Sequence, residues 1–65
     1  MNAKEYKSNY SLRYTPDIFK SLENAKSFSS HAVKTQWVVM GFVGQYLVVC
    51  PADAQRLIKN GFELI

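Results

Sequence analysis

The sequence has almost none of the side chains that stabilise very small proteins or carry out chemistry. Its 65 residues include one cysteine, Cys50, and one histidine, His31. A single cysteine excludes an internal disulfide and is typical of a reducing compartment such as the cytoplasm. Two nitrogen or sulfur ligands are too few for a structural zinc site. Because a chain this short is only marginally stable by itself, a partner chain is the remaining source of stability.

Long apolar runs are also missing. Residues 1–30 contain no apolar core of a signal peptide. The apolar stretch from Trp37 to Cys50 is shorter than the ~20 residues of a membrane helix, and its glycines and β-branched residues favour strands. We therefore expect a cytoplasmic protein without a membrane segment.

No pattern of a catalytic or cofactor-binding site is present. The five acids are scattered, without the spacing of a carboxylate dyad or a metal site, and the three glycines form no phosphate-binding loop. Cys50 precedes Pro51 at the end of an apolar run, which is typical of a buried structural cysteine rather than a nucleophile. We predict that the protein is not an enzyme and binds no cofactor or metal.

The stretch from Thr35 to Cys50 is the most informative part of the sequence. Between Trp37 and Cys50, Gln45 is the only strongly polar residue. Such a run predicts a β-hairpin that is buried on both faces.

The register of this hairpin depends on its turn. A two-residue turn at Val43-Gly44 predicts three pairs: Phe42 with Gln45, Met40 with Leu47, and Val38 with Val49. A longer loop shifts these pairs, but both faces stay apolar in either register.

Two shorter elements are expected before the hairpin. Residues 1–8 are polar and are predicted to be frayed or to lead into a strand at Tyr10–Tyr14, where apolar and polar residues alternate. The Thr15-Pro16-Asp17 segment starts a helix at Pro16, which we favour, or forms a turn before an extended Ile18-Phe19. In the second interpretation Ser21 caps the helix; the region Leu22–Phe28 is helical in both.

A helix and a short strand are expected after the hairpin. Pro51 suits the first helical turn, with Asp53 as its acid, and Asn60-Gly61 ends the helix with Gly61 in the left-handed conformation. Phe62–Ile65 alternates as a final strand. The prediction is one α+β domain over residues 1–65, in the order β-α-β-β-α-β that ferredoxin-like folds also have, with an antiparallel sheet centred on the 35–50 hairpin.

Two short helices that pack on one face leave the other face of the hairpin bare. A large exposed apolar face is rare in a soluble monomer, so we predict a homodimer built on the hairpin. The candidate interface residues share one predicted face: Val38, Met40, Phe42, Leu47 and Val49. The alternative is a monomer with one helix on each face.

The predicted function is a small protein-interaction module, an accessory or adaptor protein of the kind found in phages, plasmids or bacteria. An exposed edge, Tyr10–Tyr14 or Phe62–Ile65, could accept a partner strand. The alternative is a weakly basic nucleic-acid-binding protein, because the net charge of +3 comes entirely from residues 1–34. Its candidate residues interleave tyrosines with cations: Lys4, Tyr6, Lys7, Tyr10, Arg13 and Tyr14.

Overall fold

A computed structural model describes the whole chain, residues 1–65. Its elements in chain order are α1 (Ala3–Asn9), β1 (Asp17–Phe19), α2 (Leu22–Ser30), β2 (Trp37–Met40), β3 (Tyr46–Val49), α3 (Pro51–Lys59) and β4 (Glu63–Leu64). The strands form one antiparallel sheet. The α+β class is confirmed, and the order differs from the predicted one by the additional helix α1.

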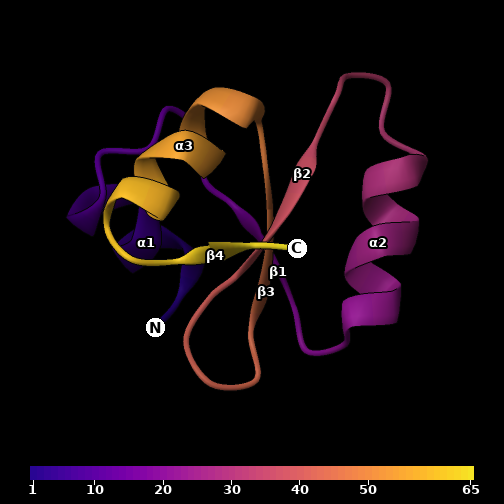
Figure 1. Cartoon of the computed structure of the whole chain (residues 1–65), viewed down its shortest axis with the longest axis horizontal. Coiled ribbons are helices and arrows are strands. Elements are labelled where there is room, and N and C mark those ends of the chain that lie inside the picture. The colour runs from indigo at the N-terminus through magenta and orange to yellow at the C-terminus, as the bar shows by residue number, and fades with distance from the viewer.

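The sheet is covered on both faces. Its strand order is β1-β3-β2-β4, so each of the crossovers β1-α2-β2 and β3-α3-β4 passes over one intervening strand. Both crossovers run in the same direction across the sheet but start from antiparallel strands. Right-handed crossovers then place α2 and α3 on opposite faces, and Figure 1 shows α2 on one side of the sheet and α1 with α3 on the other.

Two separate hydrophobic clusters result from this arrangement. The larger one, with α1 and α3, consists of Tyr6, Leu12, Val39, Leu47, Val49, Ala54 and Leu57. The smaller one, with α2, consists of Ala25, Val38 and Val48. Neither face of the hairpin is bare. The two helices expected from the sequence lie on opposite faces of the sheet, which is the helix placement of the predicted alternative with one helix on each face.

The predicted register of the hairpin is wrong by one residue. The observed pairs are Trp37 with Val49, Val38 with Val48, Val39 with Leu47, and Met40 with Tyr46. The predicted turn is present, because Gln45 N–H donates to Phe42 O and Gly44 has φ +75. Gly41 N–H, however, donates to Gln45 O at 2.9 Å. Gly41 and Phe42 therefore both lie opposite Gln45, and this one extra residue, a β-bulge, shifts every further pair by one. A shift of one residue moves every β3 side chain to the opposite face.

The N-terminal segment is a helix, and Tyr10–Tyr14 is not a strand. Asn2 and Glu5 form a reciprocal capping box, with side-chain to backbone hydrogen bonds of 2.9 and 3.0 Å. The helix buries Tyr6 completely and half-buries Tyr10, four residues apart on one face. The short alternation around Tyr10 had indicated a strand, but the cap and the i, i+4 tyrosine pair determine the structure.

The first strand and its helix follow the less favoured of the two interpretations of Thr15-Pro16-Asp17. Asp17–Phe19 pairs with β3, and α2 begins after Ser21, whose hydroxyl accepts a hydrogen bond from Asn24 N–H at 3.4 Å. A helix starting at Pro16 is therefore wrong, because pairing with the central strand β3 outweighs the local helix-start signal.

The predicted bounds of the last helix are confirmed. Pro51 is the first residue of α3, and Gly61 has φ +95 after its end. Gly61 N–H donates to Ile58 O and Phe62 N–H to Leu57 O, which is the Schellman pattern.

Tyr6 links helix α1 to the tip of the hairpin through two hydrogen bonds. Its hydroxyl accepts a hydrogen bond from Phe42 N–H at 2.9 Å and donates one to the Gln45 side chain. Gly41 makes this approach possible, because a Cβ there would lie 2.7 Å from Tyr6 Oη and 3.3 Å from Leu47 Cγ. Tyr6, and not Tyr46 as the predicted register implies, covers the bare backbone of Gly41.

We expect Gly41→Ala to lower the free energy of unfolding by about 1–3 kcal/mol, because a side chain there forces apart groups that are already packed. Urea unfolding followed by Trp37 fluorescence measures this loss. Val43→Ala, at a fully exposed position of the same turn, is the control and should change stability by less than about 0.5 kcal/mol. Wild-type stability in Gly41→Ala would contradict the close contact with Tyr6.

Candidate interaction surface

The predicted interface residues on the hairpin do not form one face. Leu47 and Val49 are buried in the cluster with α1 and α3, and Val38 is buried on the opposite face under α2. Only Met40 and Phe42 are substantially exposed. The interior of the hairpin is therefore occupied within the chain.

The predicted nucleic-acid residues are also separated. Tyr6 is buried and Tyr10 packs edge-on against Phe62, with ring centroids 5.0 Å apart. Burial, and to a lesser degree Tyr10, raises the pKa of the Tyr6 hydroxyl, while the hydrogen bond from Phe42 N–H opposes this shift. The hydroxyl is therefore protonated at neutral pH and able to donate to Gln45. Of the three tyrosines, only Tyr14 is exposed enough to stack with a base.

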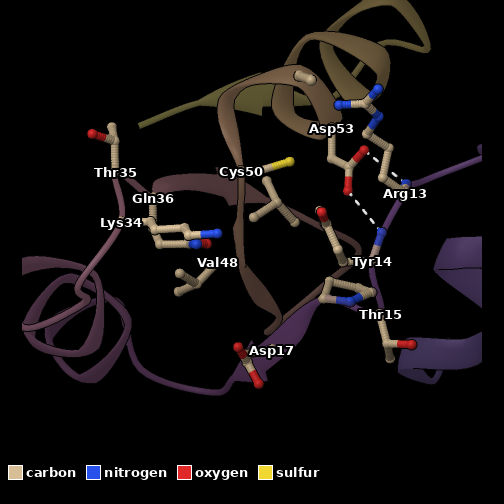
Figure 2. A pocket seen from close by; sticks show the side chains of 13 residues that line it. Arg13, Tyr14, Thr15, Asp17, Lys34, Thr35, Gln36, Val48, Cys50 and Asp53 are labelled. Carbon is tan, nitrogen blue, oxygen red and sulfur yellow. Dashed lines mark hydrogen bonds between the residues drawn. The ribbon is translucent and has the colours of Figure 1, made fainter.

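The main cavity, of about 460 Å³, lies where β3 ends and α3 begins. It is lined by residues 13–17, 34–36 and 48–50, with Ala52 and Asp53. Asp53 is only 1% exposed, and its carboxylate accepts hydrogen bonds from Arg13 N–H at 2.8 Å and Tyr14 N–H at 3.1 Å (Figure 2). The sequence had indicated Asp53 only as a first-turn acid, and its contact with a segment 39 to 40 residues away has no local signal.

Cys50 and His31 are not brought together in this cavity. Cys50 lines it as the N-cap residue of α3, without a capping hydrogen bond from its side chain. His31 follows the end of α2 and is exposed, with Nδ1 2.7 Å from Ser27 O. No group of three or more His, Cys, Asp or Glu side chains is placed to hold a metal ion. None of the helices combines the length and apolar character of a membrane span.

The two edges of the sheet differ in chemistry. The β1 edge carries Pro16, Asp17 and Lys20 around its strand. Proline and charges of this kind protect edge strands from pairing with other chains. At the opposite edge, strand β4, yellow in Figure 1, has Glu63 as the only charged side chain within Phe62–Ile65. The expectation that this segment is an edge strand is confirmed by the strand order.

The backbone of β4 leaves one residue free to pair. Glu63 lies opposite Met40, and Ile65 N–H donates to Val38 O at 2.9 Å. In an antiparallel ladder, residues alternate between pointing their backbone groups toward and away from the neighbouring strand. Leu64, between Glu63 and Ile65, therefore points its N–H and C=O away from β2, toward the open side.

Exposed apolar side chains lie on both sides of this open backbone. The exposed fractions are 46% for Leu64, 41% for Ile65 and 43% for Met40. Leu64 lies on the face of its partner Val39, where α3 contacts β4. Met40 and Ile65 lie on the face covered by α2. Met40 shares this face with Val38, two residues before it in the strand, and Ile65 lies opposite Val38. We call the surface of Met40 and Glu63–Ile65 the β4 edge.

No protein-family model, curated protein or solved structure matches this chain. Its function is therefore inferred from geometry alone.

A groove of about 330 Å³ adjoins the β4 edge. It is lined by Lys26, Ser29 and Ser30 of α2, by Gln36, Trp37 and Val38, and by Leu64 and Ile65. Lys26 is exposed and is the only charged residue in this lining. The groove thus provides a positive charge next to an apolar strand edge.

Proposed function

We propose that the protein is a non-enzymatic interaction module. Its partner binds by adding a strand to the β4 edge. The observation that carries this proposal is the outward-pointing backbone of Leu64 between exposed apolar side chains on both faces of the sheet. Backbone hydrogen bonds supply affinity in such strand addition, and alternating side chains supply specificity. The proline and charges around β1 disfavour the same mode of binding at the other edge.

Nucleic-acid binding has less support than strand addition. Single-stranded nucleic acids are bound by aromatic platforms together with cations. Tyr6 and Tyr10 are occupied in the core, which leaves Tyr14 as the exposed member of the predicted platform. We therefore place the interaction module ahead of a nucleic-acid function.

We expect Leu64→Asp to lower the amount of captured partner by about tenfold or more, because a charge at Leu64, where the partner's strand pairs, must lose its hydration. The measurement is affinity capture from native cells with quantitative mass spectrometry. The control is Val33→Asp, which makes the same kind of change at a fully exposed position between α2 and β2. Equal capture by wild type and Leu64→Asp, with both proteins folded by circular dichroism, would contradict the proposal.

A further inference from the structure

We infer that the strand added at the β4 edge is the β4 strand of a second copy of this chain, paired antiparallel about a two-fold axis at Leu64. This inference rests on the proposed function, because it names the partner of the same edge. Self-association then involves the β4 edge and not the interior of the hairpin, where Val38, Leu47 and Val49 are already buried within one chain.

The backbone selects the centre of the pairing. Glu63 pairs with Met40, and Ile65 donates its N–H to Val38 O, so neither residue offers its N–H to a second strand. Leu64 has both its N–H and its C=O on the open side. In a two-fold pair centred there, each Leu64 donates to and accepts from the partner's Leu64, and all four groups are satisfied.

The side chains agree with the same centre. It places Leu64 against the partner's Leu64 and Glu63 opposite the partner's Ile65, so apolar groups meet at the axis. A centre at Glu63 would instead bring two carboxylates together, which is unfavourable for directly opposed residues. The register centred on Leu64 therefore satisfies the backbone groups and keeps the two Glu63 side chains apart.

Charge complementarity supports a second copy as the occupant. Glu63 shares its face of the sheet with Met40, which is the face that α2 covers. In this register Glu63 lies opposite the partner's Ile65, and in each copy Ile65 lines the same groove as Lys26. Glu63 of each copy is thus directed toward the partner's Lys26, and the two-fold axis produces this contact twice. Opposite charges that match under the symmetry operation fix the register of an interface.

A charge exchange tests this geometry. Glu63→Lys alone and Lys26→Glu alone each turn both interface contacts from attraction into repulsion, and we expect each to weaken dimerisation by about tenfold or more. An equimolar mixture of the two variants restores the dimer to within a few-fold of wild type, because both contacts then join opposite charges. Sedimentation velocity from micromolar to millimolar concentration measures the dissociation constants, and native mass spectrometry identifies the mixed dimer. Lys20→Glu, an exposed change of the same charge near β1, is the matched control and should dimerise like wild type.

Each failure has a distinct meaning. A wild-type protein that is monomeric at every concentration overturns the second copy as partner, while strand addition stands if Leu64→Asp still abolishes capture of another protein. A dimer that the mixture of charge variants fails to restore overturns the pairing at Leu64. A dimer that forms equally well in Leu64→Asp overturns the inference, and equal capture of a partner by this variant overturns the proposed function.

Discussion

Replacement of Tyr6 with alanine is expected to lower the free energy of unfolding by about 4–5 kcal/mol. Tyr6 is completely buried at the centre of the larger cluster, and truncation of a buried aromatic ring costs about 3–5 kcal/mol. The lost hydroxyl also leaves Phe42 N–H and the Gln45 side chain without their partner. Since a domain of this size has a total stability of roughly 3–10 kcal/mol, we expect a substantial unfolded population at 25 °C, measured by urea titration with Trp37 fluorescence.

Tyr6→Phe separates the contribution of the ring from that of the hydroxyl. It keeps the packing against Tyr10, Phe42 and Phe62 and should cost about 1–2 kcal/mol, the usual effect of removing a partner from buried polar groups. If Tyr6→Ala were no less stable than Tyr6→Phe, α1 would not be part of the core.

Replacement of Asp53 with alanine is expected to lower the free energy of unfolding by about 3 kcal/mol. The buried carboxylate accepts the backbone N–H groups of Arg13 and Tyr14, and hydrogen bonds to a charged group contribute about 1.5–3 kcal/mol each. It also lies in the first turn of α3, where a negative charge stabilises the helix. Thermal unfolding gives the total loss, and amide hydrogen exchange at Arg13 and Tyr14 shows whether the loop is released.

The control for this change is Asp17→Ala, which removes an exposed carboxylate and should alter stability by less than about 0.5 kcal/mol. Asp53→Asn should be intermediate, because an amide oxygen still accepts one of the two N–H groups. Unchanged exchange at Arg13 and Tyr14 in Asp53→Ala would show that the carboxylate does not hold this loop.

The elements predicted correctly are those with strong local signals. Pro51 and the Asn60-Gly61 pair mark the two ends of α3, and each signal acts within one helical turn. The continuous apolar run also predicts the hairpin correctly, because strands that are buried on both faces do not alternate apolar and polar residues. The faces of the sheet were harder to predict, since a single extra residue beside the turn decides the register.

The features missed from the sequence depend on contacts between distant segments. Tyr6 is hydrogen-bonded to Phe42, which is 36 residues away in the sequence, and Asp53 is hydrogen-bonded to Arg13, which is 40 residues away. Neither contact leaves a periodic pattern. The covering of both faces follows from the direction of two crossovers, which the order of elements alone does not specify. We therefore propose the β4 edge, and not the hairpin, as the interaction surface.

The most direct test of this surface is the amide exchange rate of Leu64 as a function of protein concentration, measured by NMR. In the isolated chain Leu64 N–H points away from the sheet and should exchange quickly, whereas Ile65 N–H is bonded to Val38 O and should be protected. Pairing with a second copy should slow exchange at Leu64 by about tenfold or more between micromolar and millimolar protein, with no change at the exposed turn residue Gly44. Exchange at Leu64 that stays fast across this range, while sedimentation detects a dimer, would contradict the two-fold pairing of β4.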